Sequence, residues 1–164
     1  MNIYDFLNKN KILYERHDHP AVFTCEQALE QISHLPGAKI KNLFLRDEKG
    51  KRHFLVVVGY NKSVDLKALS ALLDAKRLGF ASPERLKKYL DIEPGSVTIL
   101  ALLNDLNHNV ELIIDKEIWQ EETFQCHPLI NTSTLVISKE NLEKFLEETG
   151  HEVRLVEIKD RGSV

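Results

Sequence analysis

Two apolar runs in the first half of the chain, at residues 39–46 (KIKNLFLR) and 52–60 (RHFLVVVGY), predict a pair of β-strands. Residues 47–50 (DEKG) separate them with the acidic start and glycine end of a tight reversal, so the pattern predicts an antiparallel hairpin. Because residues 55–58 (LVVV) are apolar at every position, we expect this strand to be buried on both faces and central in its sheet.

Apolar residues at helical spacing predict five helices, and capping residues mark the start of four of them. Thr24 opens a capping box, Asp65 and Ser138 are candidate N-caps, and Pro83 stands at a first helical position. The predicted helices span residues 2–10, a segment after Thr24, and residues 66–77, 83–90 and 139–149.

Five further runs predict strands, and a polar turn at residues 105–109 suggests a second hairpin between two of them. Because at least two connections are then hairpins, the pattern favours an α/β (α+β) fold over a doubly wound one. We expect a mixed, mainly antiparallel central sheet flanked by helices. The predicted strands are residues 12–17, 96–104, 110–116, 132–137 and 153–158.

Length and composition predict one globular domain over residues 1–160, followed by a tail at residues 161–164. The chain has 164 residues, of which 43% are hydrophobic and 29% charged, as is ordinary for a domain with a single core. No stretch reaches the ~18 apolar residues of a spanning helix, and the first residues lack the layout of a secretory signal. We therefore expect a cytoplasmic protein without a membrane partner.

Cysteine usage and charge exclude several classes of protein. Cys25 and Cys126 are the two cysteines, and neither belongs to a CxxC pair or to a Cys/His pair at zinc spacing. We accordingly expect no disulfide framework, no metal and no cofactor. The formal net charge of −3 argues against a protein that coats nucleic acid, although a local basic patch can still hold phosphates.

His127 is the most distinctive candidate for chemistry, since no glycine-rich nucleotide loop and no GxSxG motif is present. Pro128 fixes the chain behind His127 and aims its side chain, although an ordinary loop histidine remains an equal alternative. Cys126 is a poor nucleophile for His127 to activate, because adjacent residues of an extended segment point to opposite faces. Other histidines are expected at the surface, namely His17, His19, His53, His108 and His151.

Lysines and arginines gather at two places in the sequence. Lys39 and Lys41 stand at the mouth of a predicted strand, where they are either solvated charges or part of a site. A second group is either a solvated helix face or a phosphate-binding surface. Its members are Lys76, Arg77, Arg85, Lys87 and Lys88.

Four stretches, in their order and approximate spacing, resemble the bacterial prolyl-tRNA editing domains: residues 19–24 (HPAVFT), 37–50, 77–98 (ending PGSVT) and 126–137 (starting CHPL). The resemblance covers residues 2–158. It is strongest to the freestanding members that deacylate alanyl-tRNA(Pro), which are relatives of the prolyl-tRNA synthetase insertion domain and of the YbaK-type cysteinyl-tRNA(Pro) deacylases.

The resemblance implies a catalytic role for Lys41, which corresponds to a lysine near the tRNA 3′ terminus, and for His127 and Gly95. We expect Lys41 and His127 to converge on one small cavity beside the bend at Gly95. Substrate-binding residues implied with them are Asn42, Ser96, Val97, Thr98, Pro128, Leu129 and Asn131. Candidates for binding tRNA are Lys39, Lys76, Arg77, Arg85, Lys87 and Lys88.

The function implied by the resemblance is hydrolysis of the aminoacyl ester of alanyl-tRNA(Pro), with transient association with prolyl-tRNA synthetase. One departure is Ile99, where many relatives carry a proline, and this position bears on the pocket wall and on side-chain preference. Two alternatives stay open: a cysteinyl-tRNA(Pro) deacylase of the same fold, and a catalytically silent module that binds tRNA.

Overall fold

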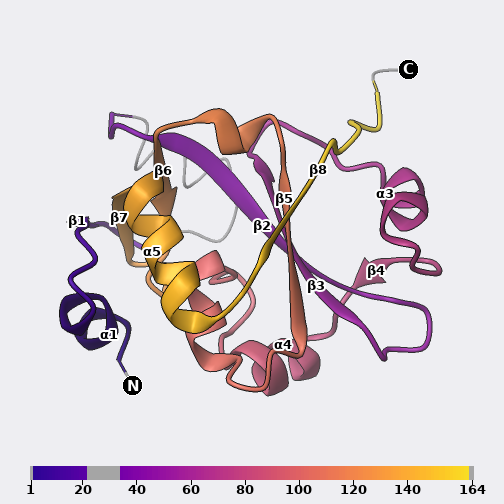
Figure 1. Cartoon of the computed structure of the whole chain (residues 1–164), viewed down its shortest axis with the longest axis horizontal. Coiled ribbons are helices and arrows are strands. Elements are labelled where there is room, and N and C mark those ends of the chain that lie inside the picture. Colours follow the sequence, from indigo (N-terminus) through magenta and orange to yellow (C-terminus); the bar gives the residue numbers. More distant parts are fainter. Residues whose placement is uncertain (1, 22–33, 163–164) are drawn as a thin grey trace.

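The computed structural model describes residues 2–21 and 34–162, in which helices lie against both faces of an eight-stranded sheet (Figure 1). The order across the sheet is β1-β7-β6-β2-β3-β5-β8, and β4 pairs with β2 outside this path. The strands are β1 Glu15–Asp18, β2 Ala38–Arg46, β3 His53–Gly59, β4 Gly79–Phe80, β5 Val110–Asp115, β6 Thr123–Cys126, β7 Ser133–Ser138 and β8 Val153–Val156.

Four strand pairings in the described part of the chain are antiparallel and three are parallel. This confirms the predicted mixed, mainly antiparallel α/β fold. The parallel pairings are those of β2 with β6, β3 with β5 and β5 with β8.

The β2–β3 hairpin is confirmed, with Leu43 opposite Val56 in an antiparallel ladder. The Asp47 side chain accepts hydrogen bonds from the backbone N–H groups of Lys51 and Arg52, at 2.8 and 3.1 Å, which closes the turn. Residues 55–58 are at most 3% exposed, because β3 lies between β2 and β5 and both of its faces are covered. The predicted central strand is therefore also confirmed.

Four helices are described, and their caps are largely those that the sequence predicts. The side chains of Asp65, Ser82 and Ser138 each accept a hydrogen bond from the first turn of the helix that follows. The helix expected after Thr24 lies outside the described residues. The helices are α1 Ile3–Lys9, α3 Leu66–Leu73, α4 Pro83–Leu90 and α5 Lys139–Thr149, with 3₁₀ helices η1 Ile99–Asn104 and η2 Ile118–Gln120.

The predicted strand at residues 96–104 is wrong, because this segment forms the buried 3₁₀ helix η1. A short run that is apolar at every position is compatible with either structure, and here the Thr98 hydroxyl accepts from the Leu100 N–H and starts a helix. The second predicted hairpin is wrong for the same reason, since β5 pairs in parallel with β3 and β8. The first strand is shorter than predicted, and β4 and β6 were not predicted.

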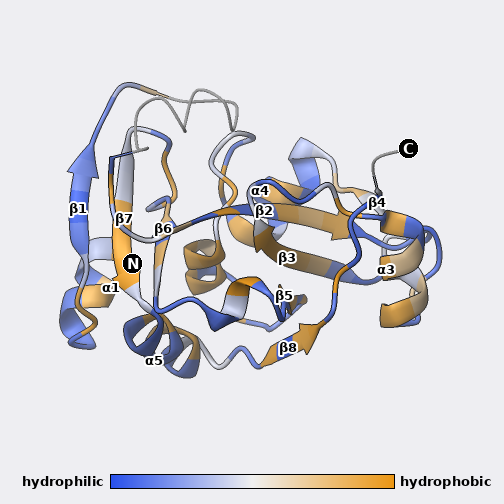
Figure 2. Ribbon diagram, turned by 90° about the horizontal axis from the view of Figure 1, so that it is seen from above, coloured by the Kyte–Doolittle hydropathy of each residue, from blue (hydrophilic) through white to orange (hydrophobic). Residues whose placement is uncertain are grey.

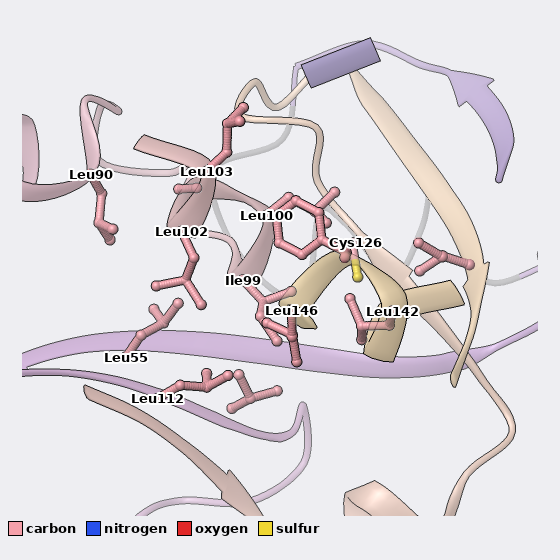
Figure 3. Packing of buried hydrophobic residues seen from close by; sticks show 14 of the residues in the cluster. Leu55, Leu90, Ile99, Leu100, Leu102, Leu103, Leu112, Cys126, Leu142 and Leu146 are labelled. Atoms are coloured by element: carbon pink, nitrogen blue, oxygen red, sulfur yellow. The ribbon is translucent and has the colours of Figure 1, made fainter. Parts of the chain in front are cut away.

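Two hydrophobic layers pack on opposite faces of the sheet. The larger contains apolar side chains of η1, α1, α4 and α5, and Figure 3 shows Ile99, Leu100 and Leu102 beside Leu142 and Leu146. The smaller contains side chains of α3 and of the opposite faces of β2, β3 and β5. Figure 2 shows the contrast between the apolar β3 and the hydrophilic outer strand β1. In the described ranges, no helix has the length and apolar character needed to cross a membrane.

Candidate active site

Lys41 and Asn42 are neighbours in β2, and their side chains point to opposite faces of the sheet. Lys41 is opposite Val58, which belongs to the smaller hydrophobic layer, whereas Asn42 is opposite Val57, which belongs to the larger one. The Asn42 Oδ1 atom is buried and has no hydrogen-bond partner among the described residues.

The pairing of β2 with β6 places Lys39 and Gln125 on one face of the sheet, and from it we infer the same face for Lys41 and His127. Lys39 is opposite Gln125 in this parallel ladder, so these two side chains share a face. Lys41 and His127 each lie two residues further along, and residues i and i+2 of an extended chain point to the same side. His127 follows the last residue of β6, and Pro128 after it favours an extended backbone at this position.

His127 is a mostly buried imidazole whose Nδ1 lies 3.4 Å from the Ser133 carbonyl oxygen. Burial lowers its pKa below the ordinary value, and the contact with the carbonyl only partly opposes this. The ring is therefore neutral near pH 7. Because a carbonyl oxygen accepts, Nδ1 carries the proton, and Nε2 offers a lone pair.

Gln125 is a residue of this region that the sequence did not single out. Its side chain is 4% exposed, and its Nε2 donates to the carbonyl oxygens of Leu35 and Pro36 at 3.1 Å and approaches that of Gly37 at 3.4 Å. It thereby fixes the segment that leads into β2. A glutamine between the apolar residues Phe124 and Cys126 was the available signal, but β6 was not recognised as a strand.

His19 is another neighbour of His127 that was expected at the surface, and it is half-buried. Its Nε2 lies 2.8 Å from the Thr134 hydroxyl, and its Nδ1 lies 2.9 Å from the Pro20 carbonyl oxygen. Its charge, when present, lowers the pKa of His127 further. His19 therefore adds to the reasons for a neutral imidazole at position 127.

The loop at residues 95–98 connects α4 with η1. Gly95 has a φ of 89° and is exposed, a conformation that glycine adopts without strain. Ser96 is 7% exposed, and its N–H donates to the Glu93 carbonyl at 3.1 Å. The Thr98 side chain is fully buried and caps η1, while Val97 is half-buried against the larger hydrophobic layer.

The loop between β6 and β7 carries the remaining predicted substrate-binding residues. Pro128 is buried, and Leu129 has a φ of 68° and packs against the larger hydrophobic layer. Asn131 is half-buried within the same loop. Ile99 is fully buried in the core at the start of η1, so its side chain is shielded from solvent.

The five basic residues of the second group lie around the β2–β3 turn and α4, and several have internal partners. Arg85 donates to the Gly50 carbonyl at 3.1 Å and lies 3.1 Å from Nε2 of His53. Lys87 pairs with Asp91 at 2.8 Å. The others are exposed: Arg77 lies 3.7 Å from Glu48, Lys88 lies over the ring of Tyr89, and Lys76 has no ion pair within the described ranges.

The Cys126 thiol is a further buried group of this region. Cys126 lies in the larger hydrophobic layer, and burial raises the pKa of its thiol to about 12, so the group is a neutral thiol. Cys25 lies outside the described residues. In residues 2–21 and 34–162, no cluster of three or more His, Cys, Asp or Glu side chains could hold a metal ion.

Comparison with known proteins identifies relatives over nearly the whole chain. The chain is 36% identical over 156 residues to the prolyl-tRNA editing protein ProX of Acetoanaerobium sticklandii, covering 93% of each. It is 38% identical over 149 residues to prolyl-tRNA synthetase associated domain-containing protein 1 of Danio rerio, covering 90% of this chain and 80% of that protein.

The fold matches that of a crystal structure provisionally described as a trans-editing enzyme for prolyl tRNA synthetase. The TM-score is 0.71 at 18% sequence identity, over 96% of this chain and 94% of the other. A family model described as the aminoacyl-tRNA editing domain matches residues 19–145. The resemblance inferred from the four motifs is thus confirmed, and the chain belongs to the aminoacyl-tRNA editing domain family.

Proposed function

We propose that this member of the editing family, an aminoacyl-tRNA deacylase, removes alanine from mischarged tRNA(Pro). The observation that carries the proposal is the parallel pairing of Lys39 with Gln125: Lys41 follows Lys39 by two residues in β2, and His127 follows Gln125 by two residues, just past the end of β6. A cation and a neutral imidazole on one face suit a substrate that has both a phosphate backbone and an ester carbonyl.

The reaction is hydrolysis of the ester between the amino acid and the terminal ribose. A water attacks the carbonyl carbon, the ribose oxygen leaves with a proton, and free alanine and uncharged tRNA result. Because this ester is already labile, positioning and charge stabilisation supply most of the required rate enhancement. The backbone N–H groups of Gly95 and Val97 are the proposed donors to the developing oxyanion, since Gly95 allows a close backbone approach and the Ser96 N–H already donates to Glu93.

Lys41 is assigned to the terminal phosphate or ribose as a fixed cation. His127 is assigned to the substrate end, where its neutral Nε2 accepts a hydrogen bond from the neighbouring ribose hydroxyl or from the attacking water. That hydroxyl helps to orient the water. Asn42 points to the opposite face of β2 from Lys41, and its buried oxygen, which is unpaired among the described residues, is the proposed substrate contact on that face.

A separate selectivity for alanine is needed because prolyl-tRNA synthetase discriminates only weakly between proline and alanine. A pocket built for proline cannot strongly exclude the smaller alanine, because each missing methylene is worth only about 1–3 kcal/mol. A second, narrower pocket that admits alanine and rejects the pyrrolidine ring by steric overlap corrects this error. Transient association with prolyl-tRNA synthetase would deliver the mischarged tRNA to this pocket.

Deacylation assays with alanyl-, cysteinyl- and prolyl-tRNA(Pro) test the proposal. We expect rapid release of alanine, slower release of cysteine and no acceleration for proline. The variant Lys41→Ala should lower kcat/KM by about 100-fold or more, as loss of a group that stabilises transition-state charge does. Lys67→Ala, which changes an exposed lysine of α3, is the matched control and should leave kcat/KM unchanged.

Other outcomes distinguish the alternatives. Faster release of cysteine than of alanine would make the chain a cysteinyl-tRNA(Pro) deacylase. Binding of tRNA without release of any amino acid would make it a silent module. Wild-type activity in Lys41→Ala would remove this lysine from the mechanism.

A further inference from the structure

A groove of about 340 Å³ opens beside Lys39, between the start of β2, the turn that follows β3 and the segment around η2. Its volume lies at the lower end of the range for small-molecule sites. Tyr60 and Asn61 line it from the turn after β3, and Glu117 and Glu121 line it from the two sides of η2. None of these four residues belongs to the catalytic or substrate-binding set described above.

Lys62 also lines the groove, and neighbouring carboxylates neutralise its charge. The Lys62 ammonium group lies 2.5 Å from Asp115 and 3.6 Å from Glu117, and it donates to the Ile158 carbonyl at 2.9 Å. Burial alone would lower the pKa of Lys62, but Asp115 outweighs this effect and the net shift is upward. Lys62 is thus a charged structural group and has few donors left for a ligand.

Other residues that line the groove have side chains that are available to a ligand. Among the described residues, the side chains of Lys39, Tyr60 and Asn61 make no hydrogen bond, ion pair or ring contact with one another or with any neighbour. The Tyr60 N–H donates to the Lys39 carbonyl at 3.1 Å, so the backbone holds the cation and the aromatic ring side by side. Glu121 adds an exposed carboxylate at the rim.

These groups match the parts of one nucleotide. An aromatic ring stacks on a base, a lysine pairs with a phosphate, and a carboxylate accepts from the exocyclic amino group of cytosine. Uracil has a carbonyl oxygen at that position, which a carboxylate repels.

The groove also lies at a suitable place relative to the proposed catalytic residues. Lys39 and Lys41 point to the same face of β2 and are two residues apart, a spacing of roughly 6.6 Å along a strand. A single-stranded RNA that places its terminal ribose near Lys41 would therefore bring a preceding nucleotide to Lys39. All tRNAs end in the single-stranded sequence CCA, so that nucleotide is a cytidine.

We propose that this groove binds a cytidine of the tRNA 3′ end, with its base on Tyr60, its phosphate at Lys39 and its amino group at Glu121. The inference rests on the proposed function, since it takes tRNA as the substrate. It adds a subsite that holds the single strand in register while the ester is hydrolysed.

Binding of uncharged tRNA(Pro), measured by fluorescence anisotropy, tests the subsite without requiring hydrolysis. We expect wild-type protein to bind tRNA(Pro) ending in CCA more tightly than the same tRNA ending in UUA. Tyr60→Ala should weaken binding of the CCA form by about 5- to 100-fold, the range for loss of one base–aromatic stack. Tyr60→Phe keeps the ring and should bind as the wild type does.

Glu121→Gln is the second variant, and it changes an exposed side chain that has no structural partner among the described residues. It should reduce the preference for CCA over UUA to less than about twofold. Equal binding of the two tRNAs by the wild type, or unchanged affinity in Tyr60→Ala, would overturn the proposal. A preference for CCA in a protein that does not hydrolyse alanyl-tRNA(Pro) would support the subsite and refute the proposed function alone.

Discussion

His151 and Asp105 form a buried pair, in which Nε2 and Oδ2 are 2.9 Å apart and both side chains are 2% exposed. The same carboxylate accepts hydrogen bonds from the backbone N–H groups of Asn109 and Val110. It therefore joins the ends of η1 and α5 to the start of β5. The expectation that His151 lies at the surface is wrong, because its ring is buried against the Asp105 carboxylate.

The variant Asp105→Asn should lower the free energy of unfolding at pH 7 by about 1–3 kcal/mol, since an amide has one acceptor oxygen where the carboxylate has two, and a buried donor loses its partner. Urea unfolding measures this change. Asp91→Asn is the control: Asp91 pairs with Lys87, but its side chain is 64% exposed, so the free energy should change little. Equal losses in the two variants would contradict a structural role for the buried pair.

Acidification should weaken the same pair. Burial raises the pKa of Asp105, but the hydrogen bonds from His151 and the two backbone N–H groups outweigh burial and bring the pKa below its ordinary value. The carboxylate thus contributes stability above the unfolded pKa of about 3.9, and the contribution is lost as pH falls through the lower folded pKa. Urea unfolding between about pH 5 and pH 3 should show a smaller decline in Asp105→Asn than in the wild type.

On acidification, His53 should lower the free energy of unfolding at a higher pH than Asp105 does. It is 1% exposed, contrary to the expectation of a surface position, and its ring lies 4.0 Å from that of Tyr89. Burial lowers its pKa, and the charge of Arg85 lowers it further. The neutral ring contributes stability above the unfolded pKa of about 6.5, and this contribution is lost as pH falls below that value.

Replacement by an aromatic residue that does not titrate isolates this effect. His53→Phe should show a smaller loss of unfolding free energy between about pH 7 and pH 5 than the wild type, while His127 accounts for part of the remaining loss. An identical slope in wild type and His53→Phe would show that His53 does not bind protons differently on folding.

Local patterns predicted the parts of the fold whose interactions are local. Asp65, Ser82 and Ser138 each cap a helix within three residues, and the β2–β3 turn is closed by neighbouring backbone groups. The parallel pairing of β2 with β6 brings Ala38 opposite Phe124. No local pattern encodes a contact across such a separation, and β6 is only four residues long.

For the candidate site, too, the sequence predicted individual residues but not the contacts between distant segments. Lys41 and His127 were identified through residues that resemble a known family, but their common face depends on the β2–β6 register. Gln125 and His151 were missed because a polar residue that is buried with its partners has the same sequence signature as an exposed one. Their roles become visible only when distant segments are brought together.

Ile99→Pro should fold, because three features of the structure accommodate proline there. Ile99 is the first residue of η1, Thr98 is extended with φ −153° and ψ 147°, and the Ile99 N–H has no hydrogen bond among the described residues. The smaller side chain should cost about 1–2 kcal/mol. Because the Ile99 side chain is fully buried, the ratio of alanine to cysteine release should change less than about threefold.

Ala101→Pro is the matched comparison for this position, since it removes the Ala101 N–H that donates to the Thr98 carbonyl at 3.1 Å. It should destabilise the protein by about 3 kcal/mol or more, as proline inside a helix does. A large change of amino-acid preference in Ile99→Pro, with stability retained, would show that this position shapes the pocket wall.

The exposed lysines of the second basic group should act on tRNA through charge alone. Lys76→Gln and Lys88→Gln should each reduce the slope of log affinity against log salt by about one if each lysine contacts one phosphate. Arg85→Gln should instead lower the melting temperature, because Arg85 bonds to the Gly50 carbonyl and to His53 inside the fold. Binding measured at several salt concentrations, together with thermal unfolding, separates the two effects. Unchanged salt slopes in both lysine variants would exclude this surface from tRNA binding, since a phosphate contact that is lost must release fewer counterions.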